Sequence, residues 1–151
     1  MGNVRRGLIG LVLVVGVLLS GCSGNLGAAS AGVVAPAQQV VRVADFQDLP
    51  AEITPEELAD LIAEAEITVI DVREDWEFAD GHIPGAVHIP LGSLRARVDE
   101  VPADVPVVLV CRSGNRSAEA YRLLSQEGFD NIKNMVGGMK DWAAAGLDVT
   151  R

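Results

Sequence analysis

The sequence predicts a small doubly wound α/β domain, in which helices cover both faces of a parallel sheet. A length of 151 residues allows one domain with a hydrophobic core and leaves little room for a second. From Gln38 onwards, short runs rich in β-branched residues alternate with helical patterns. The strand runs are apolar throughout, which is typical of strands buried on both faces by βαβ crossovers.

The first 21 residues are set apart from this domain. Arg5 and Arg6 form a basic start, and an apolar or glycine run, LIGLVLVVGVLL, follows over Leu8–Leu19 before Ser20 and Gly21. This order is typical of a secretory signal peptide, which we predict for residues 1–21. The run is shorter than the roughly 20 residues that span a bilayer, so a permanent transmembrane anchor is less favoured.

The stretch LSGC, Leu19–Cys22, resembles the lipobox of bacterial lipoproteins. The resemblance implies cleavage before Cys22, a lipid on its sulfur, and an extracytoplasmic protein held in the cell envelope by acyl chains. An ordinary signal peptide that contains a cysteine is the alternative. Residues 22–37, rich in Gly, Ala and Ser, predict a flexible, lipid-anchored linker, and residues 38–151 the folded domain.

The charge balance restricts the partners of this domain. The chain has a net charge of −9, and removal of Arg5 and Arg6 with the signal peptide leaves −11, because the first 21 residues contain no acid. A protein this acidic is not expected to bind nucleic acid.

The first expected elements are a strand at Val40–Val43 and a helix that begins after Thr54. Thr54 is an N-cap, Pro55 occupies the first helical position, and Glu57 completes a capping box. Buried strands are expected at Ile67–Val72 and, as the most apolar and central one, at Val105–Val110. The remaining expected elements are strands at Val87–Ile89 and Ile132–Val136 and helices over Leu91–Val98, Ser117–Glu127 and Met139–Ala145.

Cys111 follows the central strand, at the end of the sheet where ligands bind in such folds. A cysteine at a strand end can simply fill space in the core. Here, however, a polar, glycine-containing loop follows it, Arg112 and Arg116 bring positive charge, and the helix near Ser117 points its N–H groups at the sulfur. The loop therefore predicts an anion-binding cradle around a catalytic cysteine.

The substrate-binding candidates are the loop residues Arg112, Ser113, Gly114, Asn115, Arg116 and Ser117. Arg116, where the loop meets the helix, is favoured over Arg112 as an anion contact, because Arg112 could be a solvated surface charge. Helix capping alone would explain Ser117. Gly114 most simply supplies a positive φ.

The loop CRSGNRSA resembles the active-site loop of single-domain rhodaneses, which are sulfurtransferases. Three more stretches resemble the family in the same order: ITPEEL, VIDVREDWEFADGHIPGAVHIPL and GFDNIKNMVGGMKDWAAAGLDV. The resemblance implies a five-stranded parallel sheet and a persulfide on Cys111. Sulfur would pass from a donor such as thiosulfate to a thiol or cyanide, in a monomer without metal or other cofactor.

Several positions outside the loop are expected to support it. Asp71 and Arg73 face the same end of the sheet as Cys111 and could pair with each other or with Glu77 and so brace the loop. Met139, after the last strand, is expected in the pocket wall. Three further candidates are interpreted as structural, namely His82, His88 and Trp142.

Two other functions stay open. The cell-cycle dual-specificity phosphatases share the rhodanese fold, but their loop has five residues between cysteine and arginine, whereas four separate Cys111 from Arg116. A persulfide carrier or docking domain without turnover is the second alternative.

Overall fold

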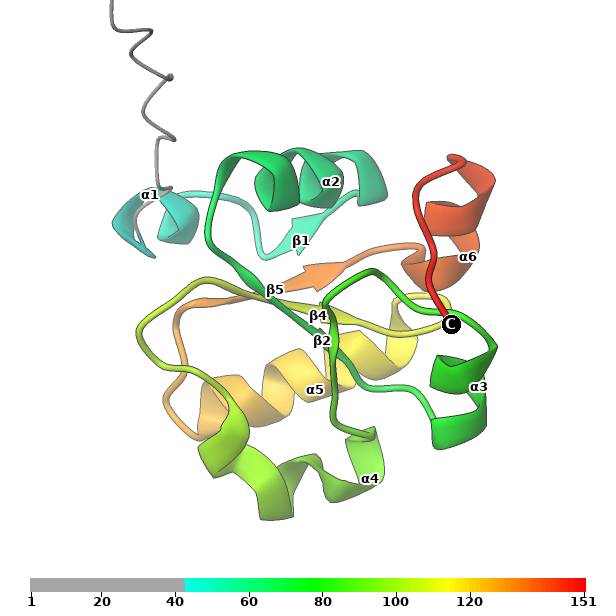
Figure 1. The fold of residues 1–151 in the computed structure, drawn as a ribbon. Helices are drawn as coiled ribbons and strands as arrows, with labels where there is room; N and C mark the ends of the chain where they lie inside the picture. The colour runs from blue at the N-terminus through cyan, green and yellow to red at the C-terminus, as the bar shows by residue number, and fades with distance from the viewer. Residues whose placement is uncertain (1–42) are drawn as a thin grey trace, which may run out of the picture. The chain divides into compact units, whose positions relative to one another are not determined.

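The computed structural model describes residues 43–151 as a parallel sheet between two layers of helices (Figure 1). The strand order is β1-β5-β4-β2-β3, and every pairing is parallel. The most apolar strand, β4, is therefore central, and the expected five-stranded parallel α/β architecture is confirmed. The strands are β1 Glu52–Ile53, β2 Thr68–Asp71, β3 Val87–His88, β4 Val107–Val110 and β5 Ile132–Met135.

Helices α1, α2 and α6 cover one face of the sheet, and α4 and α5 cover the other (Figure 1). A 3₁₀ helix, Arg95–Glu100, continues α4, so the helix expected over Leu91–Val98 changes its winding partway along. The α-helices are α1 Val43–Gln47, α2 Pro55–Glu64, α3 Asp75–Asp80, α4 Leu91–Leu94, α5 Asn115–Gln126 and α6 Gly138–Ala144.

Each face of the sheet has its own hydrophobic core. In β4, Val107 and Leu109 contribute to the cluster that includes Leu124 of α5, whereas Val108 and Val110 contribute to the opposite cluster. All four β4 side chains are fully buried. The two-sided burial explains why this strand is apolar at every position.

The start of α2 has the structure expected from the sequence. The Thr54 hydroxyl accepts a hydrogen bond from the Glu57 amide at 3.2 Å, and the Glu57 carboxylate accepts one from the Thr54 amide at 2.7 Å. This reciprocal capping box satisfies amides that have no partner within the helix.

The prediction of a strand at Val40–Val43 is wrong for Val43, because this residue begins helix α1. Val40–Arg42 lie outside the described residues. The first strand is instead β1, which pairs with β5 through Ile53 and Met135. A run of four residues is too short for its periodicity to separate strand from helix.

Two helices also differ from expectation. α3 was not expected, and α5 begins at Asn115, two residues before the expected start at Ser117. The signal peptide (1–21), the linker (22–37) and Cys22 lie outside the described residues. Within residues 43–151, no helix is both long and apolar enough to cross a membrane.

The turn after β5 holds α6 against the chain that follows β4. Gly137 and Gly138 have φ values of 72° and 60°. The Met139 amide donates to the Cys111 carbonyl at 2.8 Å, and the Lys140 amide donates to the Arg112 carbonyl at 3.0 Å. A Cβ atom on Gly138 would overlap that same Cys111 carbonyl oxygen. Position 138 therefore requires glycine for two reasons: the positive φ, and the lack of space for a Cβ atom.

We therefore expect Gly138→Ala to destabilise the full-length protein more than Gly146→Ala does. Gly146 also has a positive φ, 72°, but a Cβ there would meet no atom within 4 Å. Gly146→Ala should cost about 1–2 kcal/mol for the backbone conformation, and overpacking at Gly138 should cost about 1–3 kcal/mol more. Chemical denaturation gives both values. Equal losses in the two variants would show that the turn can accommodate a Cβ at no further cost.

Candidate active site

Cys111 lies at the carboxyl end of the central strand, and its side chain is almost fully buried, with 1% of its surface exposed. The chain then turns through Arg112, Ser113 and Gly114 into α5. Cys111 belongs to the core cluster on the α5 face of the sheet, where Leu109 precedes it. The thiol therefore lies between the end of a strand and the first turn of a helix.

Hydrogen-bond donors of the loop converge on this sulfur. The Gly114 amide donates to Cys111 Sγ at 3.1 Å, and the Ser117 hydroxyl is 3.3 Å from Sγ. The same hydroxyl lies 3.1 Å from the Gly114 carbonyl oxygen. Gly114 has a φ of 91°, which a glycine adopts without strain, so the expected positive φ is confirmed.

The surroundings of Cys111 make its thiol more acidic. Burial by itself raises the pKa of the Cys111 thiol. Hydrogen bonds from the Ser117 side chain and from the backbone amides of Ser117, Ser113 and Gly114 lower it, and together they outweigh burial, so the net shift is downward. The thiolate, which is the nucleophilic form, is stabilised by neutral donors that the fold holds in place.

Arg116 is directed at a carboxylate. Its two terminal nitrogens donate to Glu77 of α3 at 2.6 and 2.8 Å. The hydrogen bonds with Glu77 raise the pKa of the Arg116 guanidinium, and the nearby Cys111 thiolate adds a smaller effect of the same sign. The same hydrogen bonds lower the pKa of Glu77 despite its burial. The arginine favoured as an anion contact therefore joins the loop to α3.

Asp71 and Arg73 pair with each other, one of the two arrangements expected from the sequence. Arg73 Nε and Nη2 donate to the Asp71 carboxylate at 2.9 and 2.7 Å, and Nη2 also donates to the Gly81 carbonyl at 2.7 Å. The pair is buried. It joins the end of β2 to the segment after α3, the helix that carries Glu77.

The remaining loop candidates lie around the opening. The side chains of Arg112, Ser113 and Asn115 are exposed, whereas Ser117 is buried. Met139 is buried in the core cluster of the opposite face and holds the loop through its amide. The structure therefore brings the backbone of the loop and Ser117 to the sulfur, and leaves three polar side chains at the surface.

Both histidines make structural contacts. The rings of His82 and His88 stack on the ring of Phe78, and their centroids lie 3.7 and 4.4 Å from its centroid, respectively. Each histidine ring also forms a hydrogen bond with a backbone carbonyl at 2.9 Å. Trp142 is buried, and its indole nitrogen donates to the Asp148 carbonyl at 2.9 Å. These contacts agree with the structural roles expected from the sequence.

The sequence analysis missed α3 and the pairing of Glu77 with Arg116. A local signal for the helix exists, because Glu74 and Glu77 have capping-box spacing, and their reciprocal hydrogen bonds are present. Nothing local indicates the ion pair, whose partners are 39 residues apart.

The arrangement supports nucleophilic chemistry at sulfur. A thiolate surrounded by converging N–H and O–H donors can attack a soft electrophile and then hold a small anion in the same place. In the described part of the chain, no group of three or more His, Cys, Asp or Glu side chains is arranged to hold a metal ion.

Known proteins share this fold and part of this sequence. The family model described as the rhodanese-like domain matches residues 54–145. A sulfurtransferase of Allochromatium vinosum is 38% identical over 99 residues, which cover 65% of this chain and 92% of that protein. The crystal structure of a rhodanese-related protein from Thermoplasma volcanium has 35% identity and a TM-score of 0.62, covering 66% of this chain and 96% of that one.

A further relative is longer than this chain. The provisionally named sulfur carrier protein YrkF of Bacillus subtilis is 42% identical over 76 residues. These residues are 50% of this chain and only 41% of that protein, so the chain spans less than half of the length of this relative.

We expect Ser117→Ala to slow alkylation of Cys111 by iodoacetamide at neutral pH. Loss of the hydroxyl donor raises the pKa of the thiol, so less thiolate is present at pH 7, and the rate should fall about threefold to tenfold, the equivalent of one hydrogen bond. At a pH above the pKa of the thiol in both proteins, where both are ionised, the two rates should converge.

Ser125→Ala is the matched control for this measurement, because Ser125 is an exposed serine of the same helix. Its pH profile should follow that of the unaltered protein. A Ser117→Ala profile that is slower by a constant factor at every pH would mean that the hydroxyl acts on access to the sulfur and not on its ionisation.

Proposed function

The chain belongs to the family of rhodanese-like domains, and from this premise we propose that it transfers sulfane sulfur through a persulfide on Cys111. The observation that carries the proposal is the convergence of the Gly114 amide and the Ser117 hydroxyl on Cys111 Sγ. The relative from Allochromatium vinosum, of which this chain covers 92%, is named a sulfurtransferase.

In the first step, the Cys111 thiolate attacks the outer sulfur of a donor such as thiosulfate. The new bond joins Sγ to that sulfur, the S–S bond of the donor breaks, and sulfite leaves with the bonding electron pair. No general acid is required, because the leaving group departs as an anion. The lowered pKa of the Cys111 thiol increases the thiolate fraction that starts the reaction.

In the second step, an acceptor thiolate or cyanide attacks the outer sulfur of the persulfide. The bond between Sγ and that sulfur breaks, and the Cys111 thiolate is regenerated. The hydrogen-bond donors of the loop that stabilise the thiolate can also stabilise the persulfide anion. In both species the negative charge is on a sulfur atom that the loop surrounds.

The charges around the loop favour donors of low charge. Arg116 and Arg73 are each paired with a carboxylate, Glu77 and Asp71 respectively, so neither guanidinium offers an uncompensated positive charge to a dianion. The net charge of the whole chain, −9, adds repulsion at long range. We therefore propose low-molecular-weight persulfides as donors alongside thiosulfate, and expect a high KM for thiosulfate.

Persulfide transfer without turnover is the second candidate, favoured by the similarity to YrkF, which is named a sulfur carrier protein. A carrier would accept one sulfur and release it only to a partner protein. The same loop serves both functions. A phosphatase is disfavoured, because only four residues separate Cys111 from Arg116 and because the Arg116 guanidinium is paired with Glu77.

We also propose that the protein is a lipoprotein of the cell envelope, with residues 1–21 as signal peptide, 22–37 as linker and 38–151 as the rhodanese-like domain. The support is the sequence order of basic residues, apolar run and LSGC at Leu19–Cys22. The lipid on Cys22 would place the domain at a membrane surface, where donor and acceptor are extracytoplasmic.

Intact mass spectrometry of the full-length protein tests the persulfide. Incubation with thiosulfate or with glutathione persulfide should add one sulfur atom, and cyanide should remove it as thiocyanate. Cys111→Ser should show no gain, because its hydroxyl is a poor nucleophile towards sulfur. A persulfide that also appears on Cys111→Ser, or is absent with both donors, would refute the proposal, and release of phosphate from an aryl phosphate would favour the phosphatase.

The amount of thiocyanate distinguishes the two sulfur-transfer functions. A sulfurtransferase should form many equivalents per protein, with a rate that saturates only at high thiosulfate. A carrier should stop at one equivalent until its protein partner is added.

Metabolic labelling with a radioactive or clickable fatty acid tests the lipid anchor in a bacterial host. The unaltered chain should be labelled and should sediment with membranes, and Cys22→Ala should be unlabelled. Cys111→Ser is the matched control and should keep its label. An unlabelled wild-type chain would mean that LSGC belongs to an ordinary signal peptide.

A further inference from the structure

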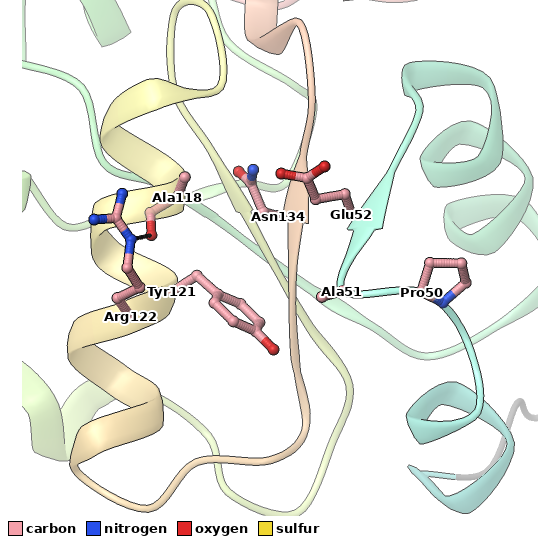
Figure 2. Close-up of a pocket in the computed structure, with 7 residues that line it drawn as sticks. All are labelled: Pro50, Ala51, Glu52, Ala118, Tyr121, Arg122 and Asn134. Atoms are coloured by element: carbon pink, nitrogen blue, oxygen red, sulfur yellow. Dashed lines mark hydrogen bonds between the residues drawn. The ribbon is translucent and has the colours of Figure 1, made fainter.

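A hollow of about 390 Å³ lies between helix α5 and the edge of the sheet formed by β5 and β1 (Figure 2). Ligand pockets in proteins commonly have volumes of about 300–1,000 Å³. The polar or charged side chains that line this hollow are Glu52, Tyr121, Arg122 and Asn134. None of its lining residues belongs to the Cys111–Ser117 loop, so the hollow is separate from the proposed site of sulfur transfer.

The floor of the hollow contains a buried amide with an unpaired oxygen. Asn134 is 3% exposed, and its Oδ1 atom has no hydrogen-bond donor among the residues that the structure describes. Asn134 follows Ile132, a core residue of the α5 face, by two positions in β5, so both side chains lie on that face. Folded proteins pair nearly all buried polar atoms, because an unpaired one loses its hydrogen bonds with water.

Charged groups of opposite sign lie on either side of this amide. Glu52 of β1 is the register partner of Asn134, so the backbones of the two residues are one strand spacing, about 4.8 Å, apart and their side chains lie on the same face of the sheet. On the opposite side, Arg122 Nε donates to the Ala118 carbonyl at 3.2 Å. No salt bridge of the described residues includes Glu52 or the Arg122 guanidinium. Figure 2 shows Asn134 between Arg122 and Glu52.

From this arrangement we infer that the hollow is a binding site for a small zwitterion, such as a free amino acid or a dipeptide. The Glu52 carboxylate and Asn134 Oδ1 are neighbouring acceptors, which match the N–H donors of an ammonium group. The terminal nitrogens of Arg122 match a carboxylate. The Tyr121 ring, directed from α5 towards β5 in Figure 2, supplies an apolar wall for the carbon atoms between the two charges.

The site is close to the loop without overlapping it. Asn134 pairs in register with Leu109, which precedes Cys111 by two residues. With a rise of about 3.3 Å per residue and the strand spacing above, the Cα atoms of Asn134 and Cys111 are about 8 Å apart. The donors that reach Cys111 Sγ come from Gly114 and Ser117, which do not line the hollow. Binding at this site therefore requires no reaction at Cys111.

Titration of the full-length, isotope-labelled protein with glycylglycine, followed by nuclear magnetic resonance, tests the inference. The Ala51 and Tyr121 amides and the Asn134 side-chain amide should shift saturably. N-acetyl-glycylglycine, which lacks the ammonium group, and glycylglycine amide, which lacks the carboxylate, should each bind about tenfold more weakly, the equivalent of one charge-assisted hydrogen bond.

Protein variants provide the matched comparison. Arg122→Gln and Glu52→Gln should each weaken glycylglycine binding about tenfold, for the same reason. Arg95→Gln and Glu66→Gln, which remove the same charges at exposed positions outside the hollow, should leave it unchanged. Cys111→Ser should also bind normally, which separates this site from persulfide formation.

The inference is overturned if glycylglycine causes no saturable shifts up to its solubility limit, because the hollow then holds water only. It is equally overturned if the acetylated and amidated dipeptides bind as well as glycylglycine, or if Arg122→Gln and Glu52→Gln both leave its affinity unchanged.

Discussion

The hydrogen bonds to Cys111 Sγ are the interaction on which the rest of the site depends. They require a strand that ends at Cys111, a left-handed residue at Gly114, and a helix whose first turn lies over the sulfur. They also require α6, whose first amides hold the Cys111 and Arg112 carbonyls. The central strand and a helix from each layer thus meet at Cys111 and the residue after it, and the parallel sheet brings them there because its strands end at a common edge.

Neutral hydrogen-bond donors stabilise the negative charge of the Cys111 thiolate. Arg73 and Arg116 are both held by carboxylates, and their contribution is to fix the position of α3 and the loop. The negative charge of a thiolate is then stabilised by backbone amides and one hydroxyl. Such donors need no reorganisation when charge develops, which is the condition for efficient electrostatic stabilisation.

The elements with strong local signals were predictable from the sequence. The apolar run of β4, the Thr54 capping box and the glycine at position 114 each have a local physical cause, and each is present in the structure. β1 was missed because a two-residue strand has no measurable periodicity and is defined by its pairing with β5. Local signals therefore locate the nucleophile and its loop.

The contacts that brace the site were less accessible to sequence reasoning. Arg116 was expected to contact an anion, and its partner Glu77 is remote in the chain, so no spacing rule could select between the two. The unpaired oxygen of Asn134 is a property of its three-dimensional neighbours. In the sequence, Asn134 is simply a polar residue within a strand.

The near-complete burial of Cys111 also limits which molecules can oxidise it. A disulfide forms only when a second sulfur approaches the first along the axis of the new bond, and a residue with 1% of its surface exposed offers little room for a thiol carried on a folded protein. Burial therefore favours the approach of small sulfur compounds over that of a protein thiol, whereas the hydrogen bonds of the loop, and not burial, lower the pKa of the Cys111 thiol.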